Sequence, residues 1–411
     1  MDLQTVTWQA YARAGGRKGI RNKVLIIYTV ECASFVAKEI SRRLNHPDVD
    51  VIGFSGCTDN DYAIRLLISM IRHPNIGGVL AVGLGCEYVQ PEKLADIAWQ
   101  EGKCADWLFI QNEGGTRKAV EKGTAYAEAM LRQLQSTPRV SMGFSELVVG
   151  AECGGSDYTS GLAGNTVVGA FYDLLVRAGG TAIFEEIVEA VGLLDLLEKR
   201  AADEPARRQI AATYKKAMQY CRDVRQYSIS PGNFVGGLTT IEEKSMGAVV
   251  KSGSSPIQGV LKVGERPRSS GLWLLDSTPD PHWMQFGITN PNDNEGLMDL
   301  ISCGAHLVFL VTGRGNVVGS AVAPVIKVTG NHQTFVRMSE DMDFDASEML
   351  WSSQRLEPLA ERLALLTADV CGGQQTNAEK LGHKEYFIPY KYQDKPAGTC
   401  KERWEQKNVG I

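Results

Sequence analysis

The chain has 411 residues, of which 44% are hydrophobic and 22% are charged, and its formal net charge is −5. This acidic balance excludes a general role in binding nucleic acid or an anionic membrane surface, because both require a basic face. The sequence does not start with a basic segment followed by an apolar one, and no apolar run reaches about 18 residues, so we expect a cytoplasmic protein with no nucleic-acid and no membrane partner.

Up to about residue 150 the sequence repeats a strand, a turn and a helix. Strands are predicted at 23–30, 51–54 and 79–84, and helices at 33–44, 61–71 and 91–101. The strands are almost wholly apolar, as in buried parallel sheets, and the helices have apolar residues three and four positions apart. This alternation is typical of a doubly wound sheet. Right-handed crossovers bring the loops after the strands to one edge of that sheet.

The α/β pattern continues after residue 150. A helix is predicted at 164–178, a strand at 181–184 with Glu185 and Glu186 at its tip, a charged helical hairpin at 193–227, and strands at 271–275 and 306–312. We therefore predict an α/β fold, doubly wound, with mostly parallel sheets and helices on both faces. The expected parts are an N-terminal α/β domain over 1–150, a central segment over 151–227, a C-terminal α/β domain over 228–370 and a polar tail over 371–411.

Three of the nine cysteines stand in glycine turns at the ends of apolar runs, namely Cys57, Cys86 and Cys153. Ligands of open α/β sheets gather outside the carboxyl ends of the strands, so these thiols are expected near one site. Three thiolates there would bind a soft metal or an iron–sulfur cluster. A lone cysteine is more often a small buried hydrophobe, so both interpretations stay open. The odd number of widely spread cysteines favours reduced thiols over disulfides.

Two glycine-rich segments are candidates for binding an anion. The segment 154–157 precedes an apolar helix, so its backbone N–H groups are expected either to hold an anion or to cap that helix. Arg314 stands between two glycines after a strand, where its guanidinium would bind a carboxylate or sulfonate through two hydrogen bonds, or serve a structural role.

His282 follows a predicted strand in a loop and is a candidate acid or base, although a loop histidine without a role fits equally well. The sequence contains no GxSxG, HExxH or P-loop motif, so the serine hydrolase, zincin and nucleoside-triphosphatase classes lack their usual support. A nicotinamide-dependent oxidoreductase is also disfavoured, because no GxGxxG follows the first strand.

Several longer motifs occur in a fixed order along the chain. They are Gly83-Leu84-Gly85-Cys86-Glu87, Glu152-Cys153-Gly154-Gly155-Ser156-Asp157, Ser230-Pro231-Gly232-Asn233, the segment 236–244, Thr312-Gly313-Arg314-Gly315, Pro324-Val325-Ile326-Lys327 and Asp341-Met342-Asp343. Together they resemble the altronate and galactarate dehydratase family over nearly the whole chain.

Two departures from the family pattern bear on the substrate. Single-chain sugar-acid dehydratases of the family begin with a small additional domain that this sequence does not have. They also usually have a glycine after the first cysteine, where this sequence has Thr58-Asp59-Asn60-Asp61-Tyr62. Both features look more like the large, beta subunits of the sulfolactate sulfo-lyases in this family, which would imply a small alpha subunit as partner.

The resemblance implies a lyase that eliminates a β substituent from a 2-hydroxy acid. The expected reaction converts (2R)-sulfolactate into pyruvate and sulfite, catalysed by the large subunit of a two-subunit enzyme. One alternative is a sugar-acid dehydratase, of altronate or galactarate type, that loses water. A second alternative is a non-catalytic subunit whose partner contains the active site.

The resemblance also implies roles for individual residues. Iron, as Fe²⁺ or an iron–sulfur cluster, is expected on Cys57, Cys86 and Cys153. Catalysis is expected from His282, Lys251 and Glu152, with the histidine or the lysine as the base. Binding of the substrate carboxylate or sulfonate is expected from Gly154, Gly155, Ser156, Asp157, Asn233, Thr312, Gly313 and Arg314.

Overall fold

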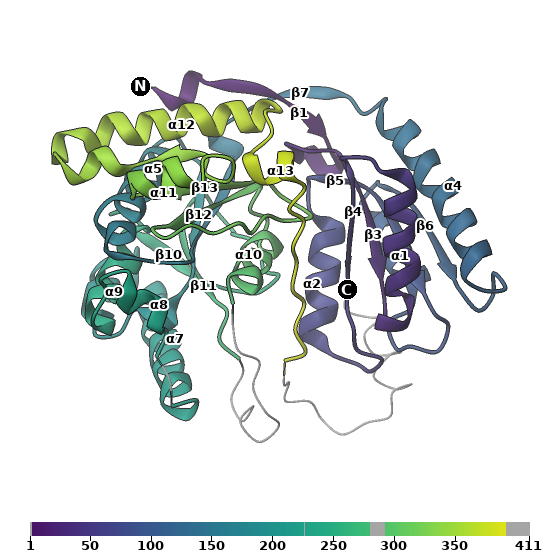
Figure 1. Cartoon of the computed structure of the whole chain (residues 1–411), viewed down its shortest axis with the longest axis horizontal. Helices are drawn as coiled ribbons and strands as arrows, with labels where there is room; N and C mark the ends of the chain where they lie inside the picture. The colour runs from purple at the N-terminus through teal and green to yellow at the C-terminus, as the bar shows by residue number, and fades with distance from the viewer. Residues whose placement is uncertain (1, 226, 280–291, 392–411) are drawn as a thin grey trace.

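Three sheets organise the chain in the computed structural model, which describes residues 2–225, 227–279 and 292–391 (Figure 1). A four-stranded and a seven-stranded parallel sheet form the cores of two domains, and a small antiparallel sheet lies along one side. The α/β class predicted from the alternating strands and helices is confirmed. None of the helices in the described part of the chain is long and apolar enough to span a membrane.

The N-terminal domain is built on four parallel strands in the order β4-β3-β5-β6. They are β3 (Lys23–Tyr28), β4 (Val49–Gly53), β5 (Ile76–Gly83) and β6 (Cys104–Phe109). Helices α1 (Glu31–Leu44) and α4 (Thr116–Leu134) pack together on one face, and α2 (Asp61–Arg72) and α3 (Pro91–Gln100) cover the other. Every residue of β3 is buried, as the apolar sequence predicts for a strand covered on both faces.

The second domain contains seven parallel strands in the order β10-β11-β9-β8-β12-β13-β14. They are β8 (Val148–Cys153), β9 (Thr181–Phe184), β10 (Ile257–Lys262), β11 (Gly271–Asp276), β12 (Leu307–Thr312), β13 (Val325–Thr329) and β14 (Phe344–Asp345). Strands of the expected central segment and of the expected C-terminal domain therefore share one sheet. Later strands are added on both sides of β8, with β9, β11 and β10 on one side and β12, β13 and β14 on the other. Such reversals of strand order create a crevice beyond the strand ends.

Helices cover both faces of this larger sheet. On one face α5 (Asn165–Arg177) packs against α12 (Leu356–Gly372), and on the other α10 (Asp293–Ser302) contacts β8 and reaches α2 of the N-terminal domain. Shorter or peripheral helices are α6 (Leu194–Lys199), α7 (Glu204–Asp223), α8 (Pro231–Val235), α9 (Ile241–Val250), α11 (His332–Arg337) and α13 (Asn377–Leu381).

The third sheet is antiparallel and joins distant parts of the chain. Its strands are β1 (Thr7–Ala12), β2 (Lys18–Gly19) and β7 (Arg139–Gly143), and β1 also contacts α12. The strand–turn–helix alternation did not predict it, because these segments follow no such pattern.

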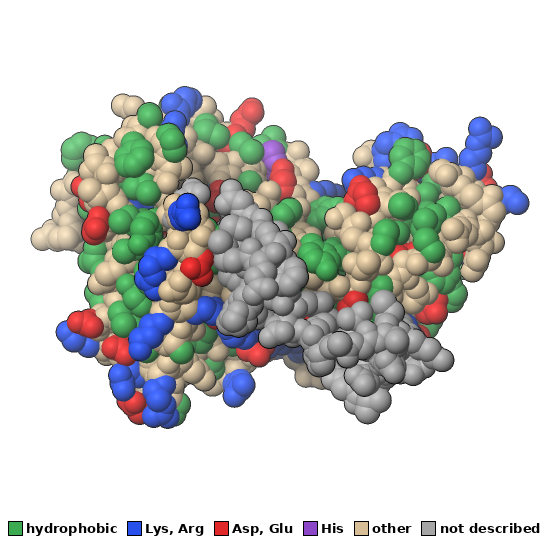
Figure 2. All heavy atoms as spheres, turned by 90° about the horizontal axis from the view of Figure 1, so that it is seen from below, with side chains coloured by type: hydrophobic (Ala, Val, Ile, Leu, Met, Phe, Trp, Pro, Cys, Tyr) green, Lys and Arg blue, Asp and Glu red, His purple; other side chains and the backbone are tan. Residues whose placement is uncertain are grey.

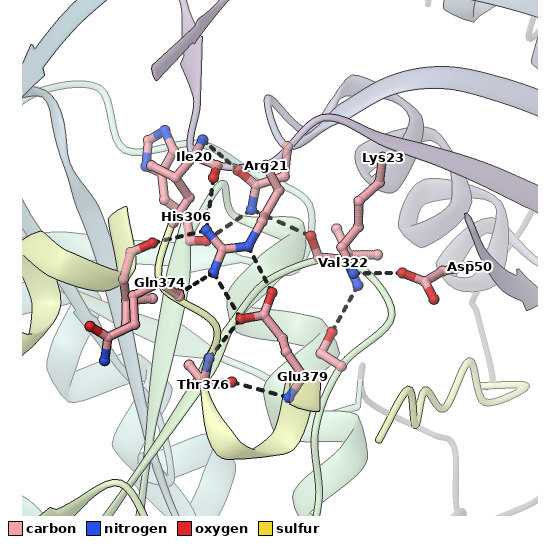
Figure 3. Close-up of polar contacts among 12 residues, drawn as sticks. Ile20, Arg21, Lys23, Asp50, His306, Val322, Gln374, Thr376 and Glu379 are labelled. Carbon is pink, nitrogen blue, oxygen red and sulfur yellow. Dashed lines mark hydrogen bonds and ion pairs between the residues drawn. The ribbon is translucent and has the colours of Figure 1, made fainter. Parts of the chain in front are cut away.

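A buried ion pair joins the start of the N-terminal domain to the C-terminal part of the chain (Figure 3). Arg21 donates to both carboxylate oxygens of Glu379 in α13, at 2.7 and 2.8 Å, and to the main-chain oxygens of Val370 and Gln374. Next to it, Lys23 binds Asp50 at 2.5 Å. Because buried charges are stable only when paired and hydrogen-bonded, this network fixes α13 against the N-terminal domain.

Candidate functional site

A cavity of about 600 Å³ lies beyond the carboxyl ends of β8, β9 and β11. The loops after these strands form part of its wall, together with the first turn of α10, the region of α8, and a C-terminal segment that runs between the domains. Figure 2 shows the two domains as separate lobes from this side of the molecule. The location is the one expected for a ligand site in an open parallel sheet.

Acidic side chains dominate the cavity wall. Seven of the described lining residues have a carboxyl group: Glu152, Glu185, Glu186, Glu189, Asp293, Glu295 and Asp299. The basic residues among the described lining residues are Lys244, Arg314 and Lys391. Since so many carboxylates cannot all be ionised in a buried space, some must be protonated and others must be paired with cations.

Glu152, at the end of β8, forms a buried pair with Glu185, at the end of β9. Burial raises the pKa of Glu152 well above its usual range, and the charge of Glu185 and a hydrogen bond to it act in the same direction. Within the described residues, Oε2 of each carboxyl is buried without a hydrogen-bonding partner. This environment favours the protonated form of Glu152, which is the form that an acid requires.

Gly296 allows this pair to lie against the first turn of α10. A Cβ atom at Gly296 would lie 2.3 Å from Oε1 of Glu185 and 2.7 Å from Oε2 of Glu152. Both distances are shorter than any side chain tolerates, so a larger residue would push the two carboxyl groups away. The glycine thus brings the amino end of a helix, with its partial positive charge, next to the pair.

Glu295 and Asp299, on the same helix, contact the N-terminal domain and the C-terminal segment. Glu295 is 3% exposed and forms an ion pair with Lys391. The hydroxyl of Tyr62 in α2 donates its single hydrogen to the Asp299 carboxylate and lies 2.6 and 2.8 Å from its two oxygens. Burial raises the pKa of Asp299 well above its usual range, although the nearby charge of Lys391 opposes this.

Two lysines neutralise carboxylates in the wall of the cavity. Lys244 binds Glu189 at 2.6 Å, and this partner raises the pKa of the lysine even though its burial acts in the opposite direction. Lys251 is 1% exposed, forms an ion pair with Glu186, and lies behind the cavity wall rather than in it. Glu186 has a left-handed backbone with a φ of 66°, which costs a non-glycine residue about 1 kcal/mol.

Five of the predicted anion-binding residues line the cavity: Gly154, Gly155, Ser156, Asn233 and Arg314. Asn233 donates to the main-chain oxygen of Ser156 at 3.0 Å, and the Ser156 hydroxyl lies 2.7 Å from the sulfur of Cys153. Arg314 is exposed, and one of its N–H groups donates to the main-chain oxygen of Gly232. Its guanidinium has further donors that can bind an anionic group.

The other three predicted anion-binding residues lie behind this surface. Asp157 accepts hydrogen bonds from the backbone N–H groups of Thr159 and Ser160, so it caps the turn before α5. Gly313 packs directly on the Asp157 carboxylate. Thr312 accepts a hydrogen bond from the backbone N–H of Gly315 at 3.0 Å. These residues hold the shape of the two glycine turns, and none of them is among the residues that line the cavity.

The three predicted metal ligands do not form one group in this structure. Cys153 lies in the cavity wall, whereas Cys57 and Cys86 are exposed in loops of the N-terminal domain. Across residues 2–225, 227–279 and 292–391, no three or more His, Cys, Asp or Glu side chains are arranged to hold a metal ion. This arrangement does not fit a three-cysteine iron site, and the iron assignment stays a prediction. His282 lies outside the described residues.

The sequence analysis did not predict most of the acidic residues that line the cavity, and it did not predict that the C-terminal segment supplies Lys391 to its wall. The position of Glu185 at the tip of a strand was a usable signal, because strand ends line the site. Lys244 also belongs to one of the family motifs. Nothing in the sequence around Asp299 or Lys391 marked them, since one is in an ordinary helix and the other is in a polar tail.

Comparison with known proteins gives matches over both domains. Residues 144–394 match the domain described as D-galactarate/altronate dehydratase, C-terminal, and residues 10–135 match that described as D-galactarate dehydratase/altronate hydrolase, second domain. An altronate dehydratase of Escherichia coli is 33% identical over 407 residues, which cover 92% of this chain and 77% of that protein. A (2R)-sulfolactate sulfo-lyase subunit beta of Chromohalobacter salexigens is 30% identical over 406 residues, which cover 96% of this chain and 100% of that protein. A galactarate dehydratase (L-threo-forming) of Escherichia coli is 32% identical over 399 residues, covering 91% and 74%.

Proposed function

This chain belongs to the D-galactarate/altronate dehydratase family, and we propose that it is a lyase that eliminates a β substituent from a 2-hydroxy acid. The main support from the cavity is that its carboxyl groups lie in different environments. Burial beside Glu185 raises the pKa of Glu152, whereas Glu295 is paired with the ammonium of Lys391. A pair of carboxyls whose environments favour opposite protonation states is the usual source of an acid and a base.

In the proposed mechanism Arg314 and the segment 154–156 bind the substrate carboxylate, because a guanidinium and backbone N–H groups match its geometry. Glu295 removes the proton at C2 of the 2-hydroxy acid. The electron pair released at C2 forms a double bond to C3 as the bond from C3 to the leaving group breaks. His282, which was predicted as a base, is the alternative to Glu295 in this role, whereas Lys251 lies behind the cavity wall.

The leaving group determines what Glu152 does. With sulfolactate, the C3–S bond breaks and its electron pair leaves on sulfite. The enol then takes a proton at C3 from Glu152 and loses its hydroxyl proton to water, which gives pyruvate. With a sugar acid, Glu152 gives its proton to the leaving hydroxyl, which departs as water, and the enol becomes a 2-keto-3-deoxy acid. The same residues would thus serve both members of the family.

We propose sulfolactate as the substrate, with a sugar acid as the alternative. Support comes from the segment 58–62, in which the sequence departs from the sugar-acid dehydratases. Within that segment Asn60 donates to the main-chain oxygen of Lys391 at 2.6 Å, and Tyr62 binds Asp299 in the cavity. The name of the Chromohalobacter relative, subunit beta, supports a small alpha subunit as the partner of this chain.

The test is an anaerobic assay of the purified chain, with and without a candidate small subunit and iron. Sulfolactate and a panel of aldonates and aldarates are the substrates, and sulfite and 2-oxo acid are measured together. Sulfite produced in step with pyruvate supports the sulfo-lyase. A 2-keto-3-deoxy product without sulfite supports the dehydratase. Absence of both products from every substrate contradicts the proposed lyase.

The iron prediction needs a separate measurement, because activity alone does not identify a metal ligand. We propose metal analysis of the anaerobically purified wild type beside the single variants Cys57→Ser, Cys86→Ser and Cys153→Ser. If the three thiols bind iron together, each variant loses most of the bound metal. Full retention of iron in all three variants rejects the cysteine site.

A further inference from the structure

The C-terminal segment 383–391, which we call the strap, leaves α13 and runs between the two domains. It follows the network of Figure 3, in which Glu379 of α13 is bound to Arg21. Along the N-terminal domain, Lys384 binds Asp50 at 2.5 Å, and the hydroxyl of Tyr386 lies 2.8 Å from that of Tyr28. The strap is therefore held by specific contacts from its first residues onward.

The last described residue of the strap, Lys391, enters the cavity. It is 5% exposed although it belongs to a polar, irregular segment. Its ammonium forms an ion pair with Glu295, donates to the main-chain oxygen of Ser277 at 3.0 Å, and lies 4.2 Å from the centre of the Tyr62 ring. The ammonium thus contacts the loop after β11 and residues of α10 and α2, so it joins the two domains at the cavity.

Burying a lysine ammonium and a carboxylate together carries a desolvation penalty, which docking of the strap alone does not require. Tyr390, one residue earlier, docks the strap by stacking on Phe54 without any charge. The contacts of Lys391 instead fix one oxygen of Glu295 and leave its other oxygen, Oε2, buried without a hydrogen-bonding partner among the described residues. A carboxylate held by one oxygen and free at the other is oriented to accept a proton.

We propose that Lys391 is a positioning residue of the site: it holds the Glu295 carboxylate ionised and oriented as the base, so that the strap is part of the catalytic machinery. The inference rests on the proposed function and names one of its determinants. Other titratable groups interact with Glu295, namely Asp299 on α10, Tyr62 on α2 and Tyr220 on α7, and Asp293 and Glu185 line the same cavity. Among these described neighbours, Lys391 is the group that carries a positive charge.

The experiment compares Lys391→Met and Lys391→Arg with the wild type, and uses Lys384→Met as the matched control. Lys384 is on the same strap and pairs with Asp50, which keeps its second partner Lys23. Steady-state kinetics are measured over pH on the substrate found active in the panel. Thermal unfolding is followed in parallel, and Lys391→Gln replaces Lys391→Met if the latter does not fold.

We expect Lys391→Met to lower kcat by on the order of 100-fold, as for a misplaced catalytic group, with KM changed by less than about threefold. The acid limb of the pH–rate profile moves up by about one to three pH units, because the carboxylate has lost its opposite charge. Lys391→Arg restores the profile and most of kcat, and Lys384→Met behaves like the wild type.

Two results would overturn this inference while leaving the lyase assignment intact. In the first, the wild type is active and Lys391→Met has the same kcat and the same acid limb of the pH–rate profile. In the second, Lys384→Met loses as much kcat as Lys391→Met. A wild type that is inactive on the entire panel is a different result: it overturns the proposed function, and the role of Lys391 in that reaction is rejected with it.

Discussion

Replacing Gly296 by alanine tests whether the carboxyl pair must lie against the first turn of α10. The new Cβ would lie 2.3 Å from Oε1 of Glu185 and 2.7 Å from Oε2 of Glu152, whereas ordinary contact begins at 3.4 Å. The carboxyls must therefore move by about 1 Å, which is enough to cost on the order of 100-fold in rate, or about 2.7 kcal/mol of barrier. Overpacking costs about 1 to 3 kcal/mol of unfolding free energy, partly offset by the better helix propensity of alanine.

A matched control separates the two effects. Gly123 lies in α4, far from the cavity in sequence and outside its wall, and a Cβ there would lie 2.3 Å from Cδ1 of Ile40. Gly123→Ala should therefore lose stability by overpacking and keep its activity. The assay is kcat on the active substrate, with the unfolding temperature measured for both variants. If Gly296→Ala keeps its kcat within about threefold of the wild type, the carboxyl pair does not have the catalytic role assigned to it.

Three further predictions concern charged groups. Glu152→Gln should lower kcat by about 10²- to 10⁴-fold. Because burial raises the pKa of Glu152 in the folded protein, the wild type should lose stability as the pH rises above the pKa of about 4.3 that the carboxyl has in the unfolded chain. The free energy of unfolding measured over pH should show that the variant lacks this loss. Arg314→Ala should raise KM about tenfold to 100-fold, the worth of a charge-assisted hydrogen bond, with a smaller change in kcat; an unchanged KM would remove Arg314 from the substrate site. Glu379→Gln should lower the free energy of unfolding, measured by urea titration, by about 3 kcal/mol, because it leaves Arg21 buried without its counterion. A change below about 1 kcal/mol would mean that water or backbone groups solvate the guanidinium.

Local patterns predicted the fold well where each residue's environment follows from its neighbours in sequence. The apolar runs at β3, β5 and β12 and the amphipathic stretch at α2 signal burial directly, and the structure contains them close to the expected bounds. The antiparallel pairing of β1 with β7 joins residues about 130 positions apart and has no local signature. In the larger sheet, strands of the C-terminal domain lie on both sides of β8 and β9, which no composition break indicates.

The same distinction applies to the candidate site. The glycine turns after β8 and β12 predicted the side of the cavity that contains Gly154, Ser156 and Arg314, because glycine and arginine have recognisable uses at strand ends. The opposite side of the cavity contains Asp299 and Lys391, which are brought together by tertiary packing and not by any local sequence pattern. An acidic residue in a helix is normally predicted to be solvent-exposed. Asp299 is buried because Tyr62 of the N-terminal domain covers it, and the local sequence does not indicate this contact.

The ion pair between Arg21 and Glu379 also has a consequence for the folding of the chain during its synthesis. The two residues are 358 positions apart, as are Tyr28 and Tyr386. A nascent chain on the ribosome can complete the four strands of the first domain early, yet its buried arginine has no counterion until almost the entire chain has emerged. Until then the apolar surface that later meets α10 stays in water, where it invites aggregation. We expect the first domain to depend on chaperones during synthesis, and a message truncated before residue 379 to yield protein that is degraded.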